Sequence, residues 1–214
     1  MVSRLILLIL GLAICIIISL EIGEVRSESV NNLLISPKEE IGAPHGKILD
    51  GWKMAGKGNF TVTDDSALRT GGQGILWHTE KEFDNFVLKL DWKVSDKGDN
   101  SGVFVRFPNL DNDPKIAVKE GYQIQIDDGA GNPLHHTGAN YDIAAPTKLV
   151  SKPPGQWNNM QIMAFNQSYK VFINGEKING FVGDRQLSGY IGLQSHDDKS
   201  TIFFRNIQIR EVPR

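Results

Sequence analysis

The stretch Phe86-Val87-Leu88-Lys89-Leu90-Asp91-Trp92-Lys93-Val94 decides the fold of this chain. Apolar side chains stand at every second position, with Lys89, Asp91 and Lys93 between them, which is the pattern of a half-buried β-strand. The same alternation recurs in residues 103–107, 122–127, 169–173, 190–196 and 201–210. Asn174-Gly175, which follows residues 169–173, is typical of a tight hairpin turn.

Helical patterns are missing from the same part of the sequence. After position 45, no window of 12 or more residues keeps an apolar helical stripe free of glycine and proline. Strands joined by short turns, with no crossover helices, predict an all-β fold with two antiparallel sheets. Residues 46–214 are too many for an immunoglobulin domain, so we expect a β-sandwich of the jelly-roll type.

Composition excludes several classes of protein. The chain has 214 residues, of which 40% are hydrophobic and 22% charged, which argues against a disordered chain or a coiled coil. Lys and Arg number 23 against 25 Asp and Glu, so the net charge of −2 gives no electrostatic reason to expect a nucleic-acid partner. The sequence also contains no phosphate-binding loop and no G-x-S-x-G nucleophile elbow.

An apolar run at the N-terminus predicts the compartment. Arg4 precedes the run from Leu5 to Leu20, a pattern typical of an export signal or of an uncleaved signal-anchor. We expect a signal peptide or signal-anchor in residues 1–27, a linker in 28–45 and a β-sandwich domain in 46–214. The protein is then secreted or held in the cell envelope, meeting the membrane only through its N-terminal segment. Cys15 lies in that segment, so disulfides cannot stabilise the exported domain.

Polar side chains gather on one face of the predicted strands. In the strand 122–127, the alternation sets Gln123, Gln125 and Asp127 on the side opposite the apolar residues. A single amide on a strand is ordinarily just solvated, but three in a row favour a binding surface. Planar amides and carboxylates bind hydroxyl groups, and aromatic rings cover C–H faces, so the pattern favours a carbohydrate ligand. Further candidates on this face are Gln194 and His196 from a second strand, and Arg106 and Phe104 from a third.

The histidines and the acidic turns give weaker evidence for a ligand site or a metal site. His135 and His136 are adjacent, so in extended chain only one of them can face the groove. The lack of cysteine in the domain, and of a histidine pair at ligand spacing, argues against zinc. The acidic turns 96–99 and 111–113 match no calcium-loop pattern. We therefore predict no cofactor and no metal site, while a divalent cation such as calcium is left open.

An ordered set of motifs links the chain to a known family. It resembles the 3-keto-disaccharide hydrolase domain, a concanavalin A-like and laminarinase-like jelly roll, over about residues 46–212. The matching segments are Leu49-Asp50-Gly51-Trp52, Asn100-Ser101-Gly102-Val103-Phe104-Val105-Arg106, Gly121-Tyr122-Gln123-Ile124-Gln125-Ile126-Asp127, His135-His136-Thr137-Gly138-Ala139-Asn140-Tyr141, Pro154-Gly155-Gln156-Trp157-Asn158, Gly192-Leu193-Gln194-Ser195-His196 and Phe204-Arg205-Asn206-Ile207.

The resemblance implies a reaction and roles for individual residues. Its substrates would be glycosides oxidised to a ketone at C3, cleaved by proton removal at C2 and loss of the group at C1. Such a reaction needs a base, an acid and a group that stabilises the enolate. On this basis Arg106 would stabilise the enolate or hold the sugar, and Asp127 or His135 would transfer protons. The expected substrate-binding residues are Asn100, Phe104, Gln123, Gln125, Thr137, Gln194 and His196.

One departure from the family pattern leaves alternatives open. Position 123 is commonly glutamate in the family and is Gln123 here. The chain is therefore expected to be a glycoside-processing hydrolase or lyase, or alternatively a non-catalytic carbohydrate-binding domain at the cell surface. A third interpretation is a purely structural envelope domain, for which Arg106→Ala would cost little stability.

Overall fold

The computed structural model describes residues 39–40 and 49–213. The predicted signal segment, 1–27, lies outside the described residues, as does all of the predicted linker except the short strand β1 (Glu39–Glu40). In the part of the chain that is described, no helix is long and apolar enough to cross a membrane.

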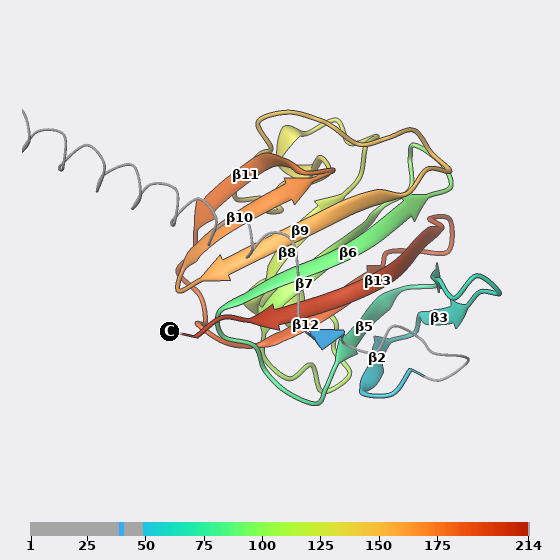
Figure 1. The fold of residues 1–214 in the computed structure, drawn as a ribbon. Coiled ribbons are helices and arrows are strands. Elements are labelled where there is room, and N and C mark those ends of the chain that lie inside the picture. Colours follow the sequence, from blue (N-terminus) through green and yellow to red (C-terminus); the bar gives the residue numbers. More distant parts are fainter. Residues whose placement is uncertain (1–38, 41–48, 214) are drawn as a thin grey trace, which may run out of the picture. The chain divides into compact units, whose positions relative to one another are not determined.

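Two antiparallel sheets pack face to face (Figure 1). The larger sheet has the strand order β11-β10-β9-β6-β13-β4-β3, with β1 paired to β13, and the smaller has the order β2-β5-β12-β7-β8. The elements of the larger sheet are β3 (Asn59–Val62), β4 (Leu68–Gly71), β6 (Phe86–Val94), β9 (Asn158–Phe165), β10 (Ser168–Ile173), β11 (Glu176–Val182) and β13 (Ile202–Glu211). Those of the smaller sheet are β2 (Trp52–Gly56), β5 (Gly74–His78), β7 (Ser101–Phe107), β8 (Tyr122–Ile126) and β12 (Tyr190–Ser195).

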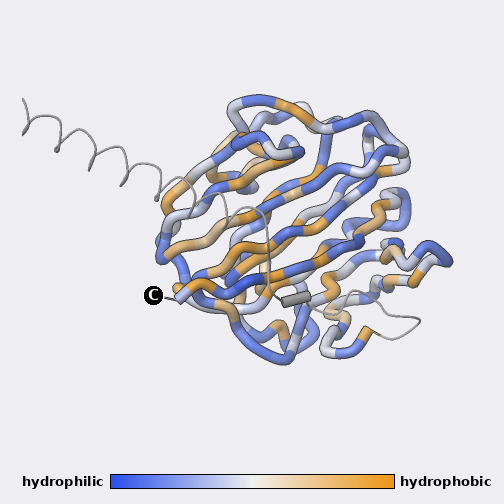
Figure 2. The backbone as a smooth tube through the Cα atoms, viewed as in Figure 1, coloured by the Kyte–Doolittle hydropathy of each residue, from blue (hydrophilic) through white to orange (hydrophobic). Residues whose placement is uncertain are grey.

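The alternation in the sequence builds the core between the sheets. Along the strands of the larger sheet, hydrophobic and hydrophilic residues alternate (Figure 2), and the apolar side chains of β6 meet those of β8 in one buried cluster. Leu88, Trp92 and Ile124 are each no more than 1% exposed. The hairpin after β10 turns through Asn174 and Gly175, both with positive φ, as their sequence predicts. The predicted all-β sandwich is thus confirmed.

A β-bulge interrupts the alternation at Arg106. Tyr190 pairs with Phe107 and Ile191 with Val105, so Arg106 is left without a partner in the neighbouring strand, and its φ is +54°. The extra residue reverses the direction of the side chains that follow it. Arg106 therefore points between the sheets, while Phe107 joins Phe104 on the outer face. The prediction that Arg106 shares a face with Phe104 is wrong.

Inside the sandwich, Arg106 is fully buried and bound by oxygen atoms. Its guanidinium donates to the carbonyl oxygens of Asn166 and, at 2.7 Å, of Asp84, and to the hydroxyl oxygen of Tyr169 at 2.8 Å. Burial raises the pKa of Tyr169 to about 12, against the influence of Arg106, so this hydroxyl stays protonated. Arg106 thus lacks access to a ligand, and the enolate-stabilising role expected for it has no support in its position.

A short helix covers half of the outer face of the smaller sheet. The helix α2 (Lys115–Glu120) was not predicted, because six residues are too few to display a helical period. Its Ala117 packs on a second apolar cluster that includes Trp77, Phe104 and Phe107. Phe104 is 0% exposed in this cluster, which contradicts its expected role as a substrate-binding aromatic side chain.

Candidate functional site

The other half of that outer face carries five polar side chains joined in a chain of hydrogen bonds, the amide ladder. Gln123 Nε2 donates to Gln194 Oε1 at 3.1 Å and to Gln125 Oε1 at 2.5 Å. Gln125 Nε2 donates to Asn100 Oδ1 at 3.1 Å, and Asn100 Nδ2 donates to Asp127 Oδ2 at 3.2 Å. The ladder thus runs from β12 across β7 to β8 and confirms that Gln123, Gln125, Asp127 and Gln194 share one face, where Asn100 joins them.

Strand order and one glycine make the ladder continuous. β7 lies between β12 and β8, so a side chain on the outer face near the start of β7 would separate the two sets of amides. Gly102 stands there, directly opposite Gln125. A Cβ atom at Gly102 would lie 2.6 Å from Gln123 Nε2, so the glycine provides the space through which Gln123 reaches Gln194.

From Gln123 through Gln125 and Asn100, each amide donates toward the carboxylate of Asp127, while Gln123 also donates the other way, to Gln194. Gln125 and Gln123 are only 1% and 8% exposed, so they mainly hold the others in place, whereas Gln194, Asn100 and Asp127 are half-buried. Gln194 Nε2 donates no hydrogen bond to any of the described residues. Its N–H groups can therefore bind a ligand. Amide chains of this kind polarise one another, and the negative charge of Asp127 favours this direction of donation.

Asp127 has the electrostatic character of a base. Burial, its largest influence, and the neighbouring Asp128 raise the pKa of Asp127, while backbone N–H groups and His136 oppose the rise. Oδ1 accepts the backbone N–H of Gly129 at 2.9 Å. The Thr137 hydroxyl accepts the backbone N–H of Asp127 at 2.9 Å. Thr137 thereby fixes the backbone of Asp127 directly after the end of β8. A raised pKa in a half-buried site is common in catalytic carboxylates.

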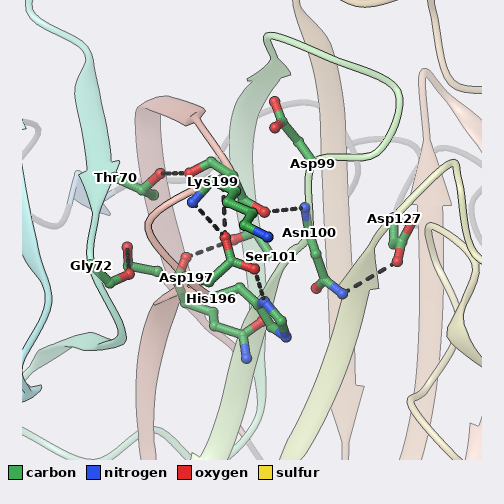
Figure 3. A network of polar contacts seen from close by, with 12 residues as sticks. Thr70, Gly72, Asp99, Asn100, Ser101, Asp127, His196, Asp197 and Lys199 are labelled. Atoms are coloured by element: carbon green, nitrogen blue, oxygen red, sulfur yellow. Dashed lines mark hydrogen bonds and ion pairs between the residues drawn. The ribbon is translucent and has the colours of Figure 1, made fainter.

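Figure 3 shows His196 and Asp127 on either side of Asn100. His196 Nδ1 lies 2.9 Å from Asp197 Oδ2, and Asp197 Oδ1 accepts the backbone N–H groups of Lys199 and Ser200. Burial alone would raise the pKa of Asp197, but the hydrogen bonds from His196 and the two N–H groups lower it to about 2. With this pKa, Asp197 is ionised at neutral pH, and its carboxylate accepts a hydrogen bond from the Nδ1–H group of His196. The other ring nitrogen, Nε2, is then left for another partner. The sequence named His196 but not Asp197.

The histidine doublet divides between two environments. His135 Nε2 lies 2.7 Å from Asp142 Oδ1, and its ring stacks on Tyr141 at 4.3 Å between centroids. Tyr141 in turn donates its backbone N–H to the carbonyl oxygen of Gln123, so this pair stands at the β8 edge of the ladder. The other histidine, His136, is the one that lowers the pKa of Asp127 through its charge. His135, predicted as an alternative to Asp127 for proton transfer, thus pairs with Asp142 and not with Asp127.

A pocket of about 160 Å³ adjoins the β12 end of the ladder. Gln194 and His196 line it, Ile75 lies beside Gln194 in the neighbouring strand β5, and Pro114 and Val118 line it from the α2 region. The helix that covers the apolar half of the sheet thus supplies a wall beside the polar half. Neither this helix nor the pocket could be recognised from the sequence.

No metal site is visible in residues 39–40 and 49–213, where no group of three or more His, Cys, Asp or Glu side chains is arranged to hold an ion. Asp99, in one of the acidic turns, is 5% exposed. Its carboxylate accepts the backbone N–H groups of Ser95, Asp96 and Thr201 at 2.8, 2.9 and 3.1 Å. In the other acidic turn, Asp113 accepts the N–H of Lys115 at the start of α2.

Fold and site together define a class: a two-sheet jelly roll with amides, a carboxylate and a histidine on one sheet face, which suits a carbohydrate ligand. A family model described as the 3-keto-alpha-glucoside-1,2-lyase-like domain matches residues 44–210, and the chain belongs to this family. It is thereby a glycoside hydrolase-like or carbohydrate-binding jelly-roll domain.

Individual relatives agree with this assignment. A 3-keto-disaccharide hydrolase of Bacteroides thetaiotaomicron is 24% identical, over 77% of this chain and 76% of the relative. A solved structure from Parabacteroides distasonis, provisionally described as a glycosyl hydrolase, is 30% identical with a TM-score of 0.63, over 75% of this chain and 99% of that one. A carbohydrate-binding module from Bacillus subtilis has a TM-score of 0.55 at 16% identity, over 75% of this chain and 96% of that one, and shows the fold alone.

Gly102→Ala tests whether the ladder is the binding surface. The new Cβ would lie 2.6 Å from Gln123 Nε2 and 2.8 Å from Gln123 Cγ, so Gln123 must withdraw and its two donated hydrogen bonds break. We expect sugar binding to weaken roughly tenfold by calorimetry. The unfolding free energy should fall by about 1–3 kcal/mol, because the buried Gln125 Oε1 loses its donor. Gly180→Ala in β11, where the nearest atom is 3.5 Å away, is the matched control. Equal binding by both variants would contradict the assignment.

Proposed function

We propose that this protein cleaves glycosides that carry a ketone at C3 of the sugar, by removing the proton at C2 and expelling the group at C1. The observation that supports the proposal most directly is the amide ladder. It ends on Asp127, whose pKa is raised, and His196 with its partner Asp197 lies on the other side of Asn100. A base and an acid on opposite sides of a hydrogen-bonding floor are what such an elimination requires.

The proposed chemistry follows from the ketone at C3, which makes the hydrogen on the neighbouring carbon C2 acidic. The Asp127 carboxylate takes the C2 proton, and the electrons of the C2–H bond form an enolate whose charge rests on the C3 oxygen. The enolate then expels the oxygen at C1, which takes the Nε2 proton of the imidazolium form of His196. Water then adds to the resulting C1–C2 double bond. The net reaction converts the glycoside and water into a keto-sugar and an alcohol. The free N–H of Gln194 is suited to the enolate oxygen.

The direct test is incubation with a panel of 3-keto-glucosides, followed by measurement of the released alcohol. Each reaction is run with and without divalent cations, since the sequence leaves a calcium-like ion open. We expect release that depends on the protein and on the C3 ketone, with none from the unoxidised glucosides. Absence of turnover across the panel in both conditions would refute the proposal.

Gln123 favours a second candidate, a carbohydrate-binding domain without catalysis, because a carboxylate is commonly found at this position in the family. Gln123→Glu separates the two. Glutamate cannot donate, so Gln125 and Asn100 must reverse their amides, and an acceptor then faces the Asp127 carboxylate. We expect the reversal to raise the pKa of Asp127 further. Gain of activity in the variant would indicate an enzyme that has lost a carboxylate, whereas sugar binding without activity in both forms would support the binding domain.

We further propose that the protein works outside the cytoplasm, secreted or anchored in the cell envelope. The support is the apolar run of residues 5–20 behind Arg4. Cell fractionation, together with N-terminal sequencing of the mature chain, tests the location and the removal of the segment. Recovery of the intact chain from the cytoplasm would contradict this proposal.

A further inference from the structure

The pocket beside the ladder differs in character from the ladder itself. Ile75, Pro114 and Val118 form its apolar walls, and Val118 is 48% exposed although its side chain is hydrophobic. A single exposed apolar side chain is ordinary on a protein surface, but Val118 adjoins Ile75 and Pro114 in one pocket, where a ligand would cover all three. The amide ladder offers hydrogen bonds, and the pocket offers mainly apolar contact.

The size of the pocket restricts what it can hold. Its volume is about 160 Å³. An apolar protein cavity of about 150 Å³ holds a benzene molecule. Gln73, Lys115 and Ser195 also line the pocket, but the hydroxyl groups of a second sugar ring that lie against Ile75, Pro114 and Val118 would lose hydrogen bonds to water without replacement. The pocket therefore fits one aromatic ring better than one sugar.

The pocket and the ladder share residues, which connects them in one site. Gln194 is the β12 end of the ladder and also lines the pocket, as does His196. A sugar on the ladder, with its C1 oxygen near His196, directs the group attached to that oxygen toward the pocket. Building on the proposed function, we propose that this pocket receives the group leaving from C1 and selects a single aromatic ring, so that aryl glycosides are preferred to disaccharides.

The charges of the lining residues predict which substituent on the aromatic ring the pocket prefers. Lys115 is among its lining residues, the charge of His196 is offset by its ionised partner Asp197, and none of the described lining residues carries a carboxylate. A ring bearing a carboxylate is thus favoured over a ring bearing an ammonium group. We expect a 4-carboxyphenyl 3-keto-glucoside to bind more tightly than the 4-(aminomethyl)phenyl compound, and added salt should reduce the difference.

The experiment compares the methyl, phenyl and glucosyl 3-keto-glucosides, which share the sugar and differ only at C1. Affinity is measured by calorimetry in the Asp127→Asn background, where the substrates stay intact, and KM is measured in the wild type. We expect the phenyl compound to bind about tenfold to a hundredfold more tightly than the methyl compound, from burial of one ring. The glucosyl compound should gain nothing over methyl.

Val118→Trp fills the pocket and should remove the phenyl preference while leaving methyl binding unchanged. Val182→Trp, at a position 80% exposed on β11, is the matched control. Val118→Ala serves as a second variant and should reduce the preference in part. Equal affinity for phenyl and methyl, tighter binding of the disaccharide, or equal behaviour of the two Trp variants would each overturn the subsite. If phenyl preference holds without turnover, the proposed chemistry fails and the subsite stands.

Discussion

Asp127→Asn is expected to lower the rate of glycoside cleavage by roughly 10²–10⁴-fold, the usual contribution of a positioned general base. Asparagine keeps the size of the side chain, but its amide cannot accept a proton at neutral pH. KM should change far less than kcat, because Gln194 and Asn100 remain to bind the sugar and Gln123 still holds Gln194 in place. Rates measured on a methyl 3-keto-glucoside provide the test.

The pH dependence gives this prediction a second readout. The pKa of Asp127 is raised, mainly by burial, so its base form is lost at a higher pH than for an ordinary aspartate. Activity should therefore fall as the pH drops through this raised pKa, and the acid limb should vanish from the residual activity of Asp127→Asn. A raised carboxyl pKa also means that the ionised group disfavours the folded state at neutral pH. The variant should thus unfold no earlier than the wild type, and an unchanged rate or acid limb would remove Asp127 from the mechanism.

Arg106→Leu is expected to have the largest effect on stability, a loss of about 3 kcal/mol or more of unfolding free energy. Leucine cannot donate to the carbonyl oxygens of Asp84 and Asn166 or to the Tyr169 hydroxyl. Each buried oxygen left without a partner costs about 1–3 kcal/mol. Urea unfolding measures the change, and the midpoint should fall by roughly 1 M or more.

Two comparisons make the Arg106 result specific. Arg69→Leu changes an exposed arginine on β4 and should stay within about 0.5 kcal/mol of the wild type. Tyr169→Phe removes one of the three acceptors and should lie between the two. Equal stability of Arg106→Leu and Arg69→Leu would contradict the structural role and restore the interpretation in which Arg106 is dispensable for folding.

The six strands that show alternation, and the direction of most of their side chains, could be predicted because alternation is a local property. The apolar residues of 86–94 and 122–127 are buried as their spacing predicts. The prediction for Arg106 is wrong because a single bulge reverses the alternation. The contacts that hold the bulged residue come from Asp84 and from Asn166, which lies 60 positions away in the chain. The helix α2 escaped prediction because its six residues cover less than two turns.

By itself, the sequence determined that this chain forms sheets and that amides and a carboxylate share one side of a strand, because a period of two depends only on neighbouring residues. The tertiary structure alone decided which of these groups meet. Gln123 and Gln194 are 71 positions apart and touch only because β7 lies between β8 and β12 and carries Gly102 at the crossing point. The same strand order sets Val118 of α2 beside Gln194, so the polar floor and the apolar pocket arise from packing between distant segments.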